Sequence, residues 1–210
     1  VSMKYFSRFI FLLFISIVIV WSDSRTDFEK LLRTQVLTGD IDAMHSLGRL
    51  LEQKGKAFHQ EALHWMSQAA KSGHAPAQYN LGVSLFNGDL GQKSIESAWM
   101  WMKLSRQAGF EPAIELLKLI SDQLSEQQLI KAQQLLSETQ TKWDIEAAKD
   151  GNMKAAVRAG IALLDGKFTI QNKPLGLSFL NQAADAGEWQ AMLTLAVRYE
   201  LGRSVNQHHG

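Results

Sequence analysis

A glycine-anchored repeat is the feature of this sequence that most restricts its fold. The segment Ala69–Gln78 recurs in outline at Ala147–Ala156 and at Ala183–Met192, with a weaker copy at Ser105–Ile114. The glycines that anchor the copies are separated by 34, 36, 42 and 36 residues, and they are Gly39, Gly73, Gly109, Gly151 and Gly187. A self-similar period of this length predicts a stack of similar supersecondary units, each of which buries its apolar face against its neighbours.

Further small residues recur at fixed distances behind each anchor. A glycine or alanine follows nine residues later, at Gly48, Gly82, Gly160 and Ala196, and a third glycine follows after fifteen, at Gly88, Gly166 and Gly202. The anchor glycine ends one helix, because a left-handed backbone is accessible to glycine at little cost. The second falls inside the next helix, where it costs about 1 kcal/mol in propensity and is tolerable only if two helices approach closely there.

The repeating unit is therefore a helical hairpin, whose first helix is called A and whose second is called B. The pattern predicts A helices near 40–54, 74–87, 110–120, 152–165 and 188–202. It predicts B helices near 58–72, 93–108, 125–149 and 174–186, after a leading helix at 27–38. Ser125 with Gln128 resembles a capping box, which predicts that a long B helix begins there. The expected fold is an all-α, right-handed α/α solenoid of about four to five hairpin repeats, preceded by an N-terminal hydrophobic segment.

The stretch Ala62–Gly82 resembles the Sel-one-like repeats (SLR), which are relatives of the tetratricopeptide repeats. The resemblance spans about residues 39–210 and departs most after Gly109, where Lys118 replaces the second glycine and the interval lengthens. That segment is interpreted as an atypical central repeat between two better-matched blocks. The resemblance implies adaptor or assembly work, often bacterial and often at the cell envelope.

The amino terminus differs from the rest of the chain. Lys4 and Arg8 precede an apolar run over residues 9–21, which is the pattern of a signal peptide and is short for a membrane span. We expect residues 1–22 to be a signal peptide or, alternatively, an N-terminal membrane anchor, with the solenoid over 27–210. The protein would then be periplasmic or secreted, or else anchored in the inner membrane and facing the periplasm. The absence of cysteine means that no disulfide supports it.

The last predicted A helix has no B helix after it in this sequence. It is expected either to cap the stack or to be covered by a partner surface or a further segment. Arg198, Glu200 and Arg203 favour the cap, because a terminal repeat needs a polar outer face.

The sequence offers no pattern that points to catalysis. Basic and acidic residues are balanced at 22 to 21, which argues against nucleic acid as a partner. Phosphate-binding loops, zinc-ligand cysteines and nucleophile elbows are missing from the sequence. His59, Glu61 and His64 form the nearest metal-like cluster, but residues five apart on a helix do not share a face. His45 is isolated, and His74 is interpreted as a helix-start residue. We therefore expect no enzyme, no cofactor and no metal site.

The leading functional hypothesis is a scaffold that binds another protein on its concave helical face. The candidate partner-binding residues are Tyr79, Asn80, Trp99, Trp189 and Arg198. One alternative suggested by the resemblance is a periplasmic immunity protein that neutralises a secreted phospholipase-type toxin. Another is an envelope or flagellar-motor assembly component. The partner is a protein in each case, and contact with a membrane would come only through an uncleaved N-terminal segment.

Overall fold

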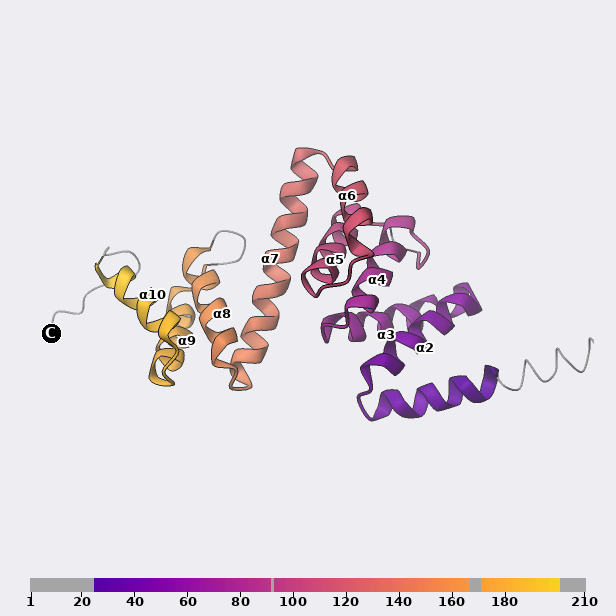
Figure 1. Cartoon of the computed structure of the whole chain (residues 1–210), viewed down its shortest axis with the longest axis horizontal. Coiled ribbons are helices and arrows are strands. Elements are labelled where there is room, and N and C mark those ends of the chain that lie inside the picture. The colour runs from indigo at the N-terminus through magenta and orange to yellow at the C-terminus, as the bar shows by residue number, and fades with distance from the viewer. Residues whose placement is uncertain (1–24, 92, 167–170, 201–210) are drawn as a thin grey trace, which may run out of the picture. The chain divides into compact units, whose positions relative to one another are not determined.

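The computed structural model describes residues 25–91, 93–166 and 171–200, which contain helices and turns and no strand (Figure 1). A leading helix covers residues 25–37. The elements that follow are α2 (Ile41–Lys54), the short 3-10 helix η1 (Lys56–Phe58), α3 (His59–Lys71), α4 (Ala75–Asn87), α5 (Ile95–Gln107), α6 (Ala113–Gln123), α7 (Glu126–Lys149), α8 (Met153–Asp165), α9 (Lys173–Asp185) and α10 (Trp189–Glu200). The predicted all-α fold is confirmed, and α2 to α9 lie within three residues of their predicted bounds. The N-terminal segment 1–22 lies outside the described residues.

Helix starts are fixed by side chains that accept a hydrogen bond from the backbone three residues ahead. Asp40, Ser94 and Asn152 act in this way at the starts of α2, α5 and α8. The capping box predicted at Ser125 and Gln128 is present, and it begins the 24-residue helix α7. Such caps satisfy backbone N–H groups that have no partner within the helix, so they define where each hairpin begins.

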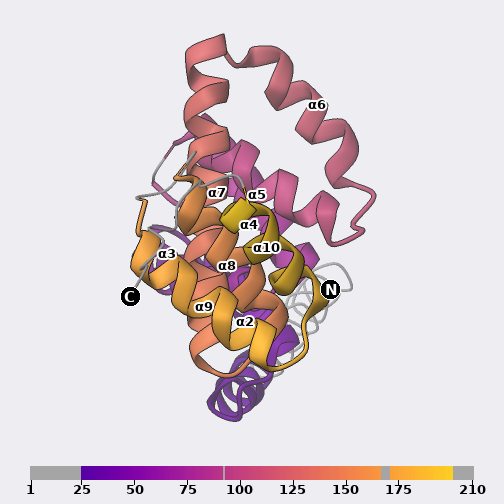
Figure 2. The same cartoon turned by 90° about the vertical axis from the view of Figure 1, so that its left-hand side faces the viewer.

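The chain divides into two compact units, which are described separately. Unit 1 runs to Gln123 and contains the leading helix and α2 to α6. Unit 2 begins at Leu124 and contains α7 to α10. Within each unit the dominant contacts are those of the A and B helices of one hairpin: α2 with α3, α4 with α5, and α8 with α9. Figures 1 and 2 both show α8 and α9 running side by side.

In these three hairpins, the glycine inside the A helix packs directly against the B helix. A Cβ atom at Gly48 would lie 2.7 Å from Met66 Cγ, one at Gly82 would lie 2.8 Å from Met102 Cε, and one at Gly160 would lie 2.7 Å from Leu180 Cγ. The B-helix side chains therefore occupy the space that a larger A-helix residue would need. The close approach predicted from the second glycine of the repeat is confirmed.

No helix among the described residues is long and apolar enough to cross a membrane. The longest of them, α7, carries charged and amide side chains along its length.

Candidate functional site

A row of polar side chains joins two successive A helices of unit 1, and we call it the α2–α4 polar strip. From α2 it contains Asp42, His45, Arg49 and Glu52, which are three or four residues apart and therefore share one face of the helix. From the start and body of α4 it contains His74, Asn80 and Ser84. Each member touches a member of the other helix, as the following distances show.

His74 lies at the first position of the strip and has two separate roles. Its Nδ1 accepts a hydrogen bond from the Ala77 backbone N–H at 3.1 Å, so it caps α4, as its predicted place at a helix start requires. Its Nε2 lies 2.8 Å from the Asp42 carboxylate. Because Nδ1 accepts, Nε2 carries the proton and donates to Asp42. His74 thus connects the start of one repeat to the A helix of the repeat before it.

Asn80 lies in the middle of the strip and is held from two sides. Arg49 Nη1 donates to Asn80 Oδ1 at 3.2 Å, and Asn80 Nδ2 lies 2.6 Å from His45 Nε2. Since a guanidinium can only donate, it fixes the amide with its oxygen toward Arg49 and its NH₂ toward His45. His45 Nε2 must then accept, so the ring is neutral.

The surroundings of His45 favour that neutral form. Burial lowers the pKa of His45 from 6.5 to about 4, with smaller contributions from the nearby His74 and Arg49 and an opposing one from Asp42. The rings of His45 and His74 lie 4.8 Å apart between centroids. The neutral His45 ring therefore lies between the charged side chains of Asp42 and Arg49 along this face of α2.

Ser84 and Glu52 close the strip at its other end. The buried Ser84 hydroxyl donates to Glu52 Oε1 at 2.7 Å. Arg49 and Asp42 remain exposed, so the strip presents one fixed cation and one fixed anion to solvent. A preorganised set of charged and amide groups of this kind suits recognition of a polar protein surface, because less side-chain freedom is lost on binding.

The remaining predicted site residues lie in different environments. Tyr79 is half-buried, and its ring packs 5.3 Å from that of Phe110. Trp99 is only 7% exposed, and its Nε1 donates to Ser121 Oγ at 2.9 Å, so it packs inside unit 1 and offers little surface to a partner. Trp189, in unit 2, is 65% exposed.

Arg198 requires a correction to the interpretation of α10 as a polar cap. Its guanidinium pairs with Asp165 at the end of α8, and its side chain is only 17% exposed. Arg198 therefore faces the neighbouring A helix rather than the outer side of α10. Glu200 is exposed, and Arg203 lies outside the described residues.

Sequence reasoning did not assign Asp42, His45, Arg49, Glu52 or Ser84 to a site. The available signal was the polar spacing along 42, 45, 49 and 52, combined with Asn80 about one repeat later. His45 looked isolated because its partners are more than 28 residues away in the sequence.

Glu61, from the metal-like cluster His59, Glu61 and His64, is bound to residues outside that cluster. Glu61 pairs with Arg33 of the leading helix and accepts from Trp65 Nε1 at 3.4 Å, and the Arg33 hydrogen bond lowers the pKa of this carboxyl. Among the described residues, no three His, Cys, Asp or Glu side chains are grouped so that they could hold a metal ion.

Comparison with known proteins identifies the repeat. The Sel1 repeat model matches residues 41–74, 75–110 and 154–188, which together make up half of the chain and leave the atypical central segment unmatched. No curated protein matches the chain significantly.

Among solved structures, the chain is similar to a protective antigen present in uropathogenic Escherichia coli strains that displays an SLR fold. That pair shares 27% identity with a TM-score of 0.42, over 85% of this chain and 38% of the antigen. It is also similar to a Sel1 repeat protein from Oxalobacter formigenes, at 20% identity with a TM-score of 0.43, over 85% of this chain and 70% of that one. Sel1 repeat proteins generally act as protein–protein interaction scaffolds, and their fold is typically non-catalytic. On the three matched repeats, the chain belongs to the Sel1 repeat family.

Proposed function

We propose that this chain is an exported interaction scaffold that binds a partner protein through the α2–α4 polar strip. The observation that carries the proposal is the two-sided anchoring of Asn80, because it fixes side chains from two repeats in one surface. Arg49 is exposed beside it and is the kind of residue that contributes most to protein interfaces. Tyr79 precedes Asn80 on α4 and packs on Phe110, so it adds an aromatic group to the helix that carries Asn80.

The proposal includes export because of the N-terminal sequence. Lys4, Arg8 and the apolar run over 9–21 support a signal peptide or an anchor, and either would place the scaffold in the periplasm or outside the cell. The lack of cysteine is compatible with an oxidising compartment, since no thiol is present to be oxidised.

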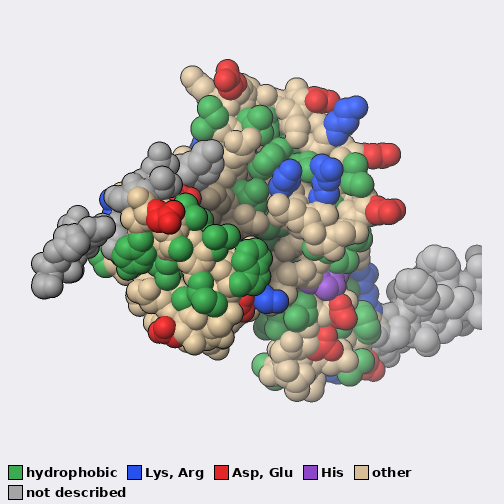
Figure 3. Space-filling model, turned by 60° about the vertical axis from the view of Figure 1, so that its left-hand side comes forward, with side chains coloured by type: hydrophobic (Ala, Val, Ile, Leu, Met, Phe, Trp, Pro, Cys, Tyr) green, Lys and Arg blue, Asp and Glu red, His purple; other side chains and the backbone are tan. Residues whose placement is uncertain are grey.

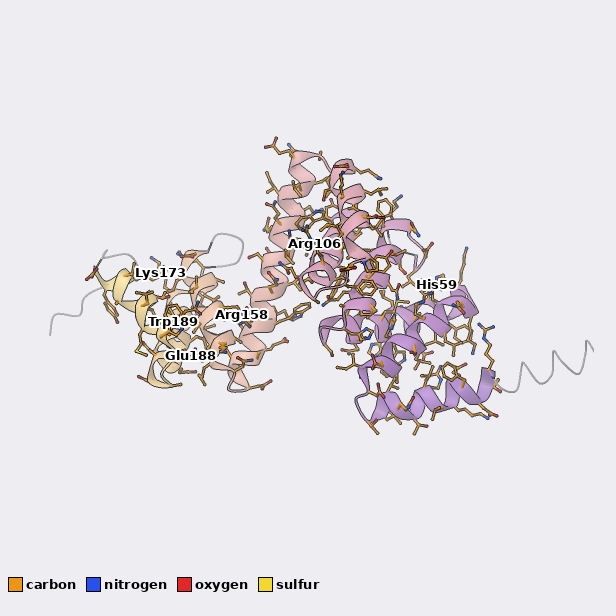
Figure 4. All side chains as sticks on the ribbon, in the orientation of Figure 1. His59, Arg106, Arg158, Lys173, Glu188 and Trp189 are labelled. Carbon is orange, nitrogen blue, oxygen red and sulfur yellow. The ribbon has the colours of Figure 1, made fainter. Side chains whose placement is uncertain are left out.

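The test begins with affinity capture of the full chain, expressed with its own amino terminus and recovered from the envelope fraction, followed by mass spectrometry. The partner's affinity is then measured against Arg49→Ala and Asn80→Ala. The matched control is Arg106→Ala, an exposed arginine on the B helix α5 of the same unit (Figure 4).

We expect each strip variant to weaken binding by at least tenfold, which corresponds to about 1.4 kcal/mol, while Arg106→Ala changes binding by less than twofold. Equal effects of all three substitutions would refute the strip as the binding surface. Recovery of the chain from the cytoplasm alone would refute export. A toxin as the captured partner would identify an immunity protein, and an envelope or motor component would identify an assembly factor.

A further inference from the structure

The Asn80 side chain can satisfy His45 and Arg49 together only while the His45 ring is neutral. A primary amide has one accepting oxygen and one donating NH₂ group. Asn80 Oδ1 accepts from Arg49 Nη1 at 3.2 Å, and Asn80 Nδ2 donates to His45 Nε2, 2.6 Å away. Each end of the amide therefore has a partner of the opposite kind.

Protonation of His45 removes this match. A charged imidazole donates from both ring nitrogens, so Nε2 would then face the Asn80 NH₂ group with a donor opposite a donor. Turning the amide over would bring its oxygen to His45, but it would also bring the NH₂ group to the Arg49 guanidinium, which can only donate. In either orientation, one of the two cations loses its hydrogen bond to Asn80.

Burial decides which of the two hydrogen bonds is lost. His45 is half-buried, and its charged ring needs a hydrogen-bond acceptor, because a buried charge without a partner is costly. Arg49 is exposed, so water can replace the amide oxygen at little cost. The turned amide is therefore the favoured arrangement once His45 is charged, and Arg49 is the side chain that is released.

We propose that Asn80 and His45 form a proton-sensitive latch, which holds Arg49 in the α2–α4 polar strip while His45 is neutral and releases it when His45 is protonated. Its effect on partner binding rests on the function proposed above, because a released Arg49 regains side-chain freedom that a partner must remove on binding. Acid should therefore weaken binding at the strip. The latch itself needs no partner and is measured in the free protein.

The neighbours of His45 set the pH at which the latch opens. The pKa of His45 is lowered from 6.5 to about 4, chiefly by burial and then by His74 and Arg49, while Asp42 raises it. His74 is held at both ring nitrogens, since Nδ1 accepts from the Ala77 N–H and Nε2 donates to Asp42. A histidine with a lowered pKa takes up its proton only near that lower pH. The latch therefore stays closed at neutral pH and opens around pH 4.

The other helices packed against α2 do not act on the His45 ring. Glu61 of α3 and Arg33 of the leading helix pair with each other, and none of the described ionisable groups on these two helices shifts the pKa of His45. Figure 3 shows basic and acidic side chains interspersed on the face drawn there, with histidine among them. Individual neighbours, rather than a broad field of one sign, therefore set the charge of His45.

The test uses the isotope-labelled full chain without any partner. NMR follows the His45 Cε1–H chemical shift, which reports protonation of the ring, and the nitrogen relaxation of Arg49 Nε–H, which reports how firmly the guanidinium is held. We expect the order parameter of Arg49 Nε–H to fall by roughly half as the pH drops from 6.5 to below 4. The fall should have the same midpoint as the His45 titration, and the Asn80 NH₂ resonances should shift at that midpoint.

Two variants separate His45 from the other groups of the strip. In His45→Gln, an amide oxygen that does not titrate accepts from Asn80, so Arg49 should stay held throughout the titration. His74→Asn is the matched control, because asparagine also caps a helix and the change removes the other imidazole. It should keep the release of Arg49 but move the midpoint to higher pH, since His74 lowers the pKa of His45. Far-UV circular dichroism at each pH confirms that the proteins remain folded.

An order parameter of Arg49 that stays constant while His45 titrates would overturn the latch. So would a release of Arg49 that persists in His45→Gln, because it would assign the release to a carboxylate of the strip, Asp42 or Glu52, instead of the imidazole. Since these measurements contain no partner, their failure leaves the proposed binding function to its own test, and failure of that test leaves the latch in place.

Discussion

The same substitution should have opposite effects in two hairpins of this chain. At Gly82, the nearest atom to an added Cβ is Met102 Cε at 2.8 Å, and the next contacts are at 3.3 Å. At Gly160, the nearest atoms are Leu180 Cγ at 2.7 Å and the Gly176 carbonyl oxygen at 2.9 Å. A methionine end can rotate away, but a branch-point carbon and a backbone oxygen move only if the whole of α9 moves.

The expected magnitudes combine helix propensity with overpacking. Replacing an interior helical glycine by alanine gains about 1 kcal/mol in propensity, and inserting a methyl group into a rigid contact costs roughly 1 to 3 kcal/mol. Gly82→Ala should therefore be neutral or stabilising by up to about 1 kcal/mol. Gly160→Ala should destabilise its hairpin by up to about 2 kcal/mol, once the propensity gain is subtracted from the overpacking cost.

Urea unfolding followed by far-UV circular dichroism measures both variants, and each is compared with wild type in the transition of its own unit. Ala196→Gly in α10 is the control for propensity alone, because nothing in the described structure covers that position, and it should cost about 1 kcal/mol. If Gly160→Ala raises the unfolding midpoint as Gly82→Ala does, the argument from the rigidity of the contacting atoms is wrong.

Three further predictions test other parts of the structure. Because the pKa of His45 is lowered to about 4 in the folded chain, the free energy of unfolding should fall as the pH drops from 6.5 to 4. The largest possible fall is roughly 3 kcal/mol, and partial exposure of the ring reduces it to about 1 kcal/mol. His45→Gln should remove this pH dependence of stability in urea titrations. Trp99→Phe should lower stability by about 2 kcal/mol, through its lost bond to Ser121 and lost volume, whereas Trp189→Phe should change it by less than about 0.5 kcal/mol in the same assay. Ser125→Ala should cost about 1 kcal/mol in the thermal unfolding of unit 2, because it removes the capping box of α7.

The helices of each hairpin could be predicted because the residues that start, end and pack them lie close together in the sequence. The anchor glycines, the capping residues and the apolar spacing all act within about 15 residues, so helix positions followed from the repeat alone. Ser125 shows this directly, since its partner Gln128 is three residues away.

The candidate site could be predicted only in part, because it depends on contacts between repeats. Asn80 was singled out, but its partner His45 is 35 residues earlier, and only the packing of α4 beside α2 brings the two together. Trp99 and Trp189 also show that contacts between helices cannot be read from the local sequence. The two tryptophans are equally hydrophobic, and the depth at which each helix lies, rather than its local sequence, makes one buried and the other exposed.

The glycine contacts also restrict how repeats of this kind can diverge after duplication. The residue at the A-helix glycine and the B-helix side chain above it fill one space, so where the contacting atoms are rigid a change in either is accepted only with a matching change in the other. The contact of Gly82 with the flexible Met102 tolerates a single substitution, whereas the contact of Gly160 with Leu180 tolerates almost none. Exchanging a single helix between two hairpins would therefore pair an A-helix glycine with a B-helix side chain of different shape, so the whole hairpin is the unit that can be exchanged without changing this contact.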